Sequence, residues 1–246
     1  MHCAVSAGVH QPAPEILLPE GPVGGTEVAA VDRGRAGPIR RIVLWRWNAA
    51  ATPDRRLRAK EGLAYIRFAG LVDDLDFGED LGADLGAGQA FDLVLIRDHV
   101  DQASWDAYVD DPHHKRVGGD IDTITQMDLT ARVDYRYYGP PSSRGAIRHV
   151  AMFRWRTPLD DAQRASLGRE LEGLRTACPS LRGLAYGDDL GLGTGHVDWV
   201  LEAHFDDLDA ARSFFADPAQ QTVASMLDAL SDADRTARLQ HRMLSG

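Results

Sequence analysis

Residues 39–47 read I-R-R-I-V-L-W-R-W, and residues 147–155 read I-R-H-V-A-M-F-R-W. Both stretches are rich in branched and aromatic side chains with few polar breaks, which predicts strands buried on both faces. Isoleucine, arginine, arginine and tryptophan recur at identical places in the two stretches, which start about 108 positions apart. A repeat at this spacing has the length of a domain. The sequence therefore predicts an internal duplication.

Composition excludes several classes of protein. The chain has 246 residues, 44% of them hydrophobic, which is enough to fill the cores of two domains. No run approaches the roughly 20 apolar residues that a membrane span needs. The net charge of −10 disfavours a nucleic-acid surface and an anionic membrane. We therefore expect neither nucleic acid nor a membrane as partner.

The cysteines and the N-terminal stretch point to no particular functional site. Cys3 and Cys178 form no disulfide framework or zinc spacing, so a cytoplasmic location is expected. Residues 1–37 lack a basic start followed by a long apolar core, so they do not resemble a signal peptide. Their proline and glycine content predicts an irregular tail.

The first repeat is expected at 38–138. Thr52, Pro53 and Asp54 together predict a helix start, because a capping hydroxyl, a proline in the first turn and an acidic group all favour one. The expected elements are strands at Ile39–Trp47, near Phe77, at Phe91–Asp98 and at Ala131–Tyr138, and helices at 52–69, 103–109 and 113–124.

The second repeat, 146–246, is expected to reproduce each element after a linker at 139–145. Thr157-Pro158 predicts the start of its first helix. Its other expected elements are strands at Ile147–Trp155, Asp198–Phe205 and Arg235–Met243, a turn at Tyr186–Gly191, a short helix at Ala210–Phe215 and a break at Asp217-Pro218.

The order β-α-β-β-α-β, with the second helix split, is the ferredoxin-like pattern. A four-stranded sheet with helices on one face needs cover for its other face. Two such sheets in one chain can cover each other. We therefore predict an α+β fold in which two ferredoxin-like repeats form an intramolecular α+β barrel.

Three motifs resemble a known family. They are the start I-R-H-V-x-x-F-R-W, the F/Y-G-x-D-L-G turn, and a helix break of the form aromatic-x-x-D-P-x-H. Together they resemble the stress-responsive A/B barrel (Dabb) domains of the dimeric α+β barrel superfamily, over about 39–138 and 146–243. The family includes plant stress proteins and a plant polyketide cyclase that makes olivetolic acid.

The resemblance to that cyclase implies particular catalytic groups. The cyclase uses a histidine on the first strand, with a tyrosine and a second histidine flanking the proline break. They act between sheet and helices, without a cofactor, in an aldol closure of a poly-β-ketone. Such chemistry needs a base that titrates near neutrality and a donor that stabilises the developing enolate.

Neither repeat carries the complete set. In the first repeat Tyr108 and His114 match the tyrosine and second histidine, but Arg41 occupies the first-strand position. In the second repeat His149 matches the first-strand histidine, but its partners are Phe214 and Gln220. We take His149, His114 and Tyr108 as candidate catalytic residues. The alternative is that both histidines are structural and Tyr108 only packs its helix onto the sheet.

Arginine and aromatic residues suggest how a substrate is bound. Arg41 cannot act as a base near neutrality. Arg97 shares strand parity with Leu93 and Leu95, so it is expected on the same face as Arg41. The predicted substrate-binding residues are Arg41, Arg97, Trp45, Phe214 and Gln220, which favours an anionic or aromatic small molecule. The alternative is that the arginines pair with local acids such as Asp98 or Glu79 and that Trp45 packs in the core.

No metal or cofactor is expected. Adjacent residues on a helix point about 100° apart, so His113 and His114 do not chelate together easily. The glycine-rich loops at 82–88 and 191–195 lack a complete phosphate-binding motif and are interpreted as hairpin loops near a pocket mouth.

Three functions remain open from the sequence. The first is a cofactor-independent acid–base enzyme acting on a small polyketide-like or β-dicarbonyl substrate, as a cyclase, an aldol-type lyase or an isomerase. The second is a non-catalytic small-molecule-binding or stress-associated module. The third is a cofactor-free monooxygenase.

The duplication predicts the oligomeric state. Because each repeat supplies the other's sheet cover within one chain, the protein should run as a monomer-sized species in gel filtration. A strictly obligate dimer in which the two repeats of one chain stay apart would contradict the predicted barrel.

Overall fold

The computed structural model describes residues 38–72, 74–139, 146–195 and 197–244. The expected tail at 1–37 and most of the expected linker lie outside these ranges. All described elements belong to one compact unit, 35–246. Among the described residues, no helix is both long and apolar enough to span a membrane.

The first repeat folds as expected. Its elements are β1 (Ile39–Trp45), α1 (Pro53–Phe68), β2 (Asp74–Glu79), β3 (Gln89–Ala90), β4 (Leu93–His99), α2 (Gln102–Asp110), α3 (Pro112–Asp122), the 3-10 helix η1 (Met127–Leu129) and β5 (Ala131–Arg136). β2, β4, β1 and β5 form a four-stranded sheet in that order, and all three neighbouring pairs are antiparallel. The Thr52 side chain caps α1, as the sequence predicted.

The second repeat repeats this order. Its elements are β6 (Ile147–Phe153), α4 (Asp161–Ala177), β7 (Gly183–Asp188), β8 (Trp199–Phe205), α5 (Leu208–Ala216), α6 (Pro218–Leu230), the 3-10 helix η2 (Ala233–Arg235) and β9 (Ala237–Arg242). The prediction that Thr157-Pro158 starts its first helix is wrong. α4 begins at Asp161 because Asp160 and Gln163 form a reciprocal capping box, which satisfies two otherwise unpaired N–H groups.

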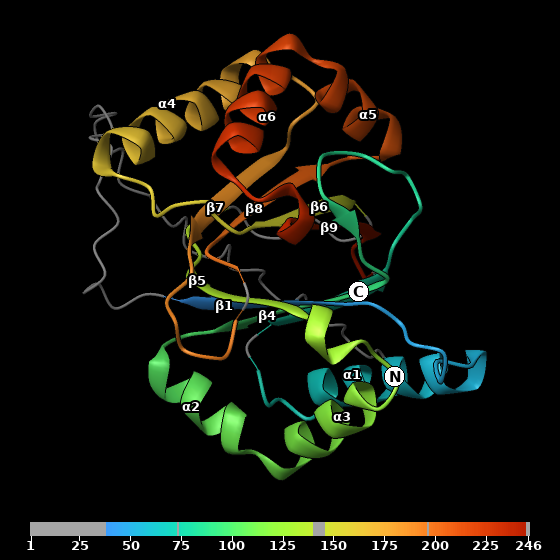
Figure 1. Ribbon diagram of the computed structural model, residues 1–246. Coiled ribbons are helices and arrows are strands. Elements are labelled where there is room, and N and C mark those ends of the chain that lie inside the picture. The colour runs from blue at the N-terminus through green and yellow to red at the C-terminus, as the bar shows by residue number, and fades with distance from the viewer. Residues whose placement is uncertain (1–37, 73, 140–145, 196, 245–246) are drawn as a thin grey trace, which may run out of the picture. The chain divides into compact units, whose positions relative to one another are not determined.

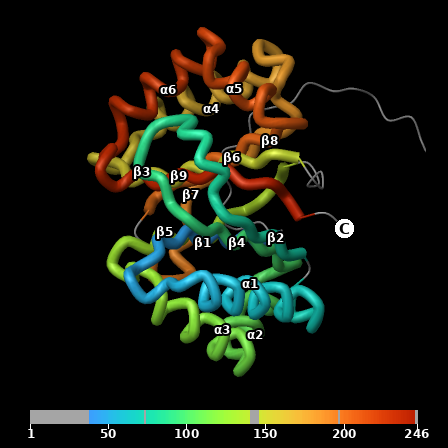
Figure 2. Tube along the Cα trace, turned by 90° about the vertical axis from the view of Figure 1, so that its right-hand side faces the viewer, coloured from blue at the N-terminus to red at the C-terminus, as the bar shows by residue number. Residues whose placement is uncertain are grey.

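One strand crosses between the repeats. β3, from the first repeat, pairs in parallel with β9 and makes the second sheet five-stranded, in the order β3-β9-β6-β8-β7. Figure 2 shows the segment that carries β3 running alongside β9. The sequence did not predict this pairing, because β3 is only two residues long and has no periodicity of its own.

The two sheets pack face to face. α1–α3 cover the outer face of one sheet and α4–α6 cover the outer face of the other (Figure 1). Between the sheets lies an apolar cluster to which both repeats contribute, including Ile42, Val133, Val150 and Leu239. The fold is thus two ferredoxin-like halves arranged as an intramolecular α+β barrel, as predicted.

Charged side chains bridge the two sheets inside this apolar cluster. Glu202 on β8 is fully buried, and both its carboxylate oxygens accept hydrogen bonds from Arg40 Nη1 on β1, at 3.2 and 3.1 Å. Arg148 Nε on β6 lies 3.4 Å from Glu202 Oε2, and the Tyr135 hydroxyl on β5 donates to Oε1. Burial alone would raise the pKa of Glu202, but Arg40 and Arg148 hold it below its ordinary value.

Removing this carboxylate should weaken the whole fold. Glu202→Gln leaves Arg40 and Arg148 buried with less compensating charge, which costs about 3 kcal/mol or more of unfolding free energy. Urea denaturation at neutral pH measures the change. Arg182→Ala, which breaks the exposed Arg182–Asp206 pair, is the matched control and should cost less than about 1 kcal/mol. Equal costs for the two variants would show that the buried network adds no stability of its own.

Candidate functional site

The helix-covered face of the first sheet carries the polar residues predicted from the first repeat. Arg41 on β1 is the register partner of Arg97 on β4, so their side chains leave neighbouring strands on the same face. Arg40, one position earlier, points between the sheets instead. The expected shared face of Arg41 and Arg97 is therefore confirmed by the register.

The break between α2 and α3 positions Tyr108 and His114. Asp111 Oδ1 accepts hydrogen bonds from the backbone N–H groups of His113 and His114, at 2.7 and 3.0 Å, which starts α3 directly after Asp111. This turn brings the rings of Tyr108 and His114 to a centroid separation of 4.1 Å. The Arg97 guanidinium carbon lies 3.7 Å from the Tyr108 ring centroid, a cation–π contact. Arg97, Tyr108 and His114 therefore form one cluster.

Arg41 is held by a buried acid from the same repeat. Its Nη1 lies 3.5 Å from Asp134 Oδ2 on β5, and Trp105 Nε1 donates to Asp134 Oδ1 at 3.0 Å. The expected alternative partners Asp98 and Glu79 are wrong for Arg41. Alternation places the Asp98 side chain on the other face, where it pairs with Arg40, and the Glu79 side chain pairs with Lys60.

His99 also belongs to the cluster, and the sequence analysis missed it. Its ring packs edge-on against Tyr108, with centroids 5.4 Å apart, and its Nδ1 lies 3.3 Å from Ser104 Oγ. Strand parity with Arg97 was the available signal, since residues two apart on a strand share a face. Trp105 and Asp134 carried no motif that marked them in advance.

Three buried polar atoms of the cluster have no hydrogen-bond partner within the described part of the chain. They are Arg97 Nε, the Tyr108 hydroxyl and His99 Nε2. Buried polar groups are usually paired, and an unpaired one costs about 1–3 kcal/mol. Two donors and an imidazole nitrogen thus lie unpaired in one small buried region.

Burial and positive charge tune the titration of this cluster. Burial and the neighbouring Arg97 lower the pKa of His114 to about 4, and the same two causes lower the pKa of His99 to about 3. Burial also lowers the pKa of Arg97 to about 10 and raises that of Tyr108. At neutral pH both imidazoles are therefore neutral, while Arg97 keeps its positive charge.

The tautomer of His114 follows from the hydrogen-bond contact of its ring with the backbone of Val109. Its Nδ1 lies 3.4 Å from the carbonyl oxygen of Val109. Because a carbonyl oxygen only accepts, Nδ1 carries the proton and Nε2 keeps its lone pair. The half-buried His114 ring thus offers a basic nitrogen.

A loop of the second repeat lies against this site. The backbone N–H of Asp134 donates to Asp189 Oδ1 at 2.9 Å, and the N–H of Leu190 donates to the carbonyl oxygen of Asp134 at 2.7 Å. At Gly193 an added Cβ would lie 2.6 Å from Arg41 Nη2, so a larger residue there would require the Arg41 guanidinium to move. This glycine-rich loop of the second repeat therefore lies against Arg41, a predicted substrate-binding residue of the first repeat.

The residues predicted from the second repeat lie between the second sheet and its helices, away from the cluster of Arg97, Tyr108 and His114. They are His149 on β6, Phe214 on α5 and Gln220 on α6. The buried His149 has its Nδ1 2.7 Å from Gln240 Nε2, which also donates to the carbonyl oxygen of Leu85 at 2.8 Å. An amide nitrogen only donates, so His149 Nδ1 is the acceptor. Burial, with a contribution from Arg238, lowers the pKa of His149 to about 3.

Aromatic side chains fill the rest of that face. Phe215 packs edge-on against His149 at a centroid distance of 4.8 Å, and Phe214 packs against Phe205 at 5.2 Å. Gln220 is buried on α6. The glycine-rich loop of the first repeat reaches this face, where an added Cβ at Gly86 would lie 3.0 Å from the His149 ring.

Trp45 lies in the apolar cluster beneath α1 and α3, together with Val43, Leu63 and Ile121. It is 6% exposed, and its Nε1 has no hydrogen-bond partner among the described residues. The structure therefore groups Trp45 with the core of the first repeat.

Comparison with known proteins identifies the family. The model of the stress responsive A/B barrel domain matches residues 39–136 and again 147–237. The chain therefore belongs to this family and contains two copies of its domain. No protein of curated function gave a significant match.

Solved structures share the fold at low identity. An anthrone oxidase-like protein matches with a TM-score of 0.61 and 9% identity, over 87% of this chain and 94% of that chain. A protein from Fusobacterium nucleatum, provisionally described as a monooxygenase, matches with a TM-score of 0.58 and 11% identity, over 85% of this chain and 94% of that chain. At these identities the likeness shows the fold and leaves the chemistry open.

Within the part of the chain that the structure describes, no group of three or more histidine, cysteine, aspartate or glutamate residues is arranged to hold a metal ion. A cavity of about 360 Å³ lies elsewhere, between the two sheets, and none of the predicted site residues lines it.

The electrostatic link between Arg97 and His114 is directly testable. Arg97→Met removes a positive charge that disfavours the imidazolium, so the pKa of His114 should rise from about 4 toward its ordinary 6.5. The rise should stay incomplete because burial is the larger cause. A proton NMR titration of the histidine ring signals, assigned with His114→Gln, measures the pKa. Arg116→Met, which removes a charge from an exposed position on α3, is the control and should leave the pKa in place. Equal shifts in both variants would contradict the assignment.

Proposed function

We propose that the protein is a cofactor-independent acid–base enzyme that acts on a small polyketide-like or β-dicarbonyl substrate, with its active site in the first repeat. The observation that carries the proposal is the cluster of Arg97, Tyr108 and His114. It combines a neutral imidazole, a buried phenol without a hydrogen-bond partner and a buried guanidinium.

His114 is the proposed base. Its Nε2 lone pair takes an acidic proton from the carbon between two carbonyl groups, and the electrons of that C–H bond form the enolate. A base with a low pKa suits only an acidic C–H bond, which a β-dicarbonyl compound provides. The charge of a bound enolate offsets that of Arg97, which raises the pKa of His114 when the proton must be accepted.

Tyr108 and Arg97 are the proposed stabilising groups. The Tyr108 hydroxyl donates a hydrogen bond to the enolate oxygen, and the Arg97 guanidinium supplies a fixed positive charge next to it. Both donors are in place before the charge develops, so little reorganisation is needed. Arg41 is held against Asp134 and contributes a second, weaker positive charge.

Ring closure completes the proposed reaction. The enolate carbon attacks a distant carbonyl carbon of the same substrate, a carbon–carbon bond forms, and the carbonyl π electrons become an alkoxide. The proton held by His114 then moves to this alkoxide and regenerates the neutral base. The same groups, run in reverse, support an aldol-type lyase, and proton return to another carbon gives an isomerase.

The second repeat is the less suitable place for this chemistry. His149 Nδ1 already accepts a hydrogen bond, and Phe214 stands where the first repeat has Tyr108. The His149 ring sits among Phe215, Gly86 and Gln240, which leaves it no phenol donor. We therefore assign it a structural role within this proposal.

Two other functions remain as proposals. A non-catalytic small-molecule-binding or stress-associated module would use the same unpaired donors to hold an anion. A cofactor-free monooxygenase would use His114 to deprotonate an electron-rich phenol or anthrone-like substrate, which the described chemistry of the fold neighbours suggests.

A turnover assay tests the leading proposal. Linear poly-β-keto thioesters and acids are incubated with wild type, His114→Gln, Tyr108→Phe and His149→Ala, and products are identified by mass spectrometry. We expect wild type to form cyclic product and His114→Gln to lose about 100-fold or more in kcat/KM, the typical contribution of a general base. Tyr108→Phe should lower kcat more than it raises KM, because its donor acts on the developing charge.

Controls separate the alternatives. His113→Gln changes the exposed neighbour that packs on Tyr65 instead of Tyr108, and should keep wild-type rates. Loss of activity only in His149→Ala would move the site to the second repeat. Background conversion in every variant, with substrate still bound by titration calorimetry, would favour the binding module. Dioxygen uptake with an anthrone would favour the monooxygenase.

A further inference from the structure

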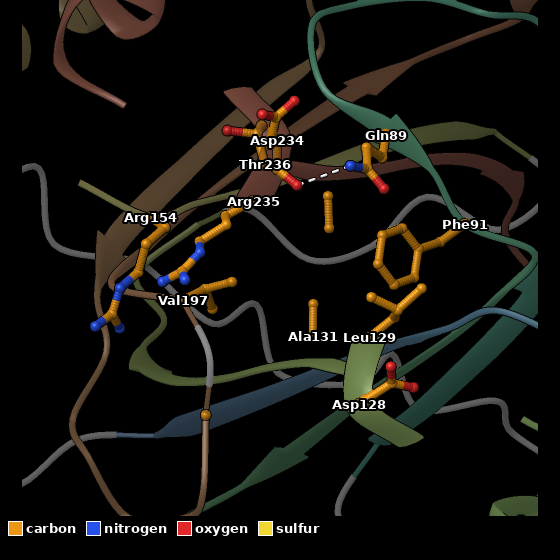
Figure 3. Close-up of a pocket in the computed structure, with 12 residues that line it drawn as sticks. Gln89, Phe91, Asp128, Leu129, Ala131, Arg154, Val197, Asp234, Arg235 and Thr236 are labelled. Carbon is orange, nitrogen blue, oxygen red and sulfur yellow. Dashed lines mark hydrogen bonds between the residues drawn. The ribbon is translucent and has the colours of Figure 1, made fainter. Parts of the chain in front are cut away.

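The cavity between the sheets lies where β5 and β9 begin, on the opposite side of each sheet from the helix-covered faces. Its volume of about 360 Å³ falls within the 300–1,000 Å³ range of small-molecule sites. Segments of both repeats line it, including the 3-10 helices η1 and η2 (Figure 3). It therefore differs in place and lining from the proposed active site.

Equivalent positions of the two repeats face each other across this cavity. Phe91 corresponds to Val197, each two residues before its strand β4 or β8. Leu129, the last residue of η1, corresponds to Arg235, the last residue of η2. A dimer of identical chains would place the same residue at both positions of each pair. With both repeats in one chain, the two positions can hold different residues. The cavity accordingly has Arg235 at one position and Leu129 at the equivalent position.

The cavity is consequently polarised. Figure 3 shows Arg154 and Arg235 side by side on one side, with Phe91 and Leu129 on the other. Phe91 and Val197 are buried and present apolar surface to the cavity. The charged side and the apolar side come from different segments and meet only in the folded chain.

Both guanidinium groups retain free donors. Arg154 uses Nη1 for Asp198 Oδ1 at 3.1 Å. Arg235 Nε lies 3.7 Å from Asp232 Oδ2, too far for a hydrogen bond, and its guanidinium makes none to the described residues. An exposed ion pair of this kind is worth about 0–1 kcal/mol, so an incoming anion can compete with it.

The acidic lining residues do not occupy the arginine side. Asp128 and Asp234 are exposed, and Figure 3 places them at the lower and upper margins of the cavity. The Gln89 amide is engaged at both ends, since Nε2 donates to the Asp234 carbonyl at 2.8 Å and Oε1 accepts from Arg46 Nη1 at 3.0 Å. On the arginine side of the cavity, the unengaged polar groups are therefore the two guanidinium groups.

We propose that this cavity binds a small amphipathic carboxylate. The carboxylate lies between Arg154 and Arg235, where planar guanidinium groups provide charge-assisted hydrogen bonds. The apolar body of the ligand packs against Phe91, Leu129 and Val197. The site is independent of the proposed enzyme activity, because it lies between the sheets and shares no residue with the cluster of Arg97, Tyr108 and His114.

Titration calorimetry with 4-phenylbutyrate and the uncharged 4-phenylbutanol tests this site. We expect saturable binding of the carboxylate, at least 10-fold tighter than that of the alcohol of the same shape. Arg154→Met and Arg235→Met should each weaken carboxylate binding about 10-fold and leave the alcohol unchanged, which corresponds to about 1.4 kcal/mol per charged contact. Raising the salt concentration should weaken the carboxylate only.

Two further variants make the test decisive. Arg212→Met is matched to Arg235→Met, because Arg212 is also exposed and paired with an acid three positions earlier, but it lies on α5 away from the cavity. It should keep wild-type affinity. Val197→Trp fills the cavity and should abolish binding of both probes, with thermal melting as the check that the variant folds.

Equal affinity for the acid and the alcohol, or equal effects of Arg212→Met and Arg235→Met, would overturn the proposal. Retained carboxylate binding in a folded Val197→Trp variant would also overturn it. Turnover of polyketide-like substrates is measured in a separate assay. Neither binding of the carboxylate nor its absence therefore changes the test of the proposed function.

Discussion

The buried carboxylate of Glu202 is the interaction on which the arrangement of the two sheets depends. Arg40 reaches it from the first sheet and Arg148 from the second, so one charge ties together strands that lie far apart in the sequence. In an apolar interior these groups tolerate little displacement, because losing a partner leaves a charge unpaired. The surrounding apolar residues drive the sheets together, and the charges select one alignment.

This alignment places the arginine of the buried network and the arginine of the candidate site on opposite faces of β1. Arg40 and Arg41 are adjacent and point to opposite faces, and a shift of one residue would exchange them. With Arg40 held between the sheets, Arg41 must lie under the helices with Arg97. The same alternation in β6 places Arg148 between the sheets and His149 under α4–α6. The shared start of the two repeats therefore places an arginine of the buried network on one face and a candidate site residue on the other.

The two repeats differ at their equivalent helix breaks. The first repeat has a tyrosine and a histidine there, together with unpaired buried polar atoms, whereas the second has Phe214 and Phe215 packed edge-on. The loop that follows β2 contacts β9 of the second repeat, and the loop that follows β7 contacts β5 of the first repeat. Each repeat thus completes the surroundings of the other.

The sequence by itself determined the repeat, the order of the main elements and the shared face of Arg41 and Arg97, because these follow from local periodicity and from caps such as Thr52. The resemblance of the proline break to that of the cyclase also marked Tyr108 and His114 as a pair. Only the tertiary structure decided that Arg41 pairs with Asp134, that His99 joins the cluster and that β3 adds to the second sheet. It also decided that the glycine-rich loop of each repeat contacts the opposite repeat. These contacts join residues far apart in the chain, and their energy depends on burial and distance, which no local pattern encodes.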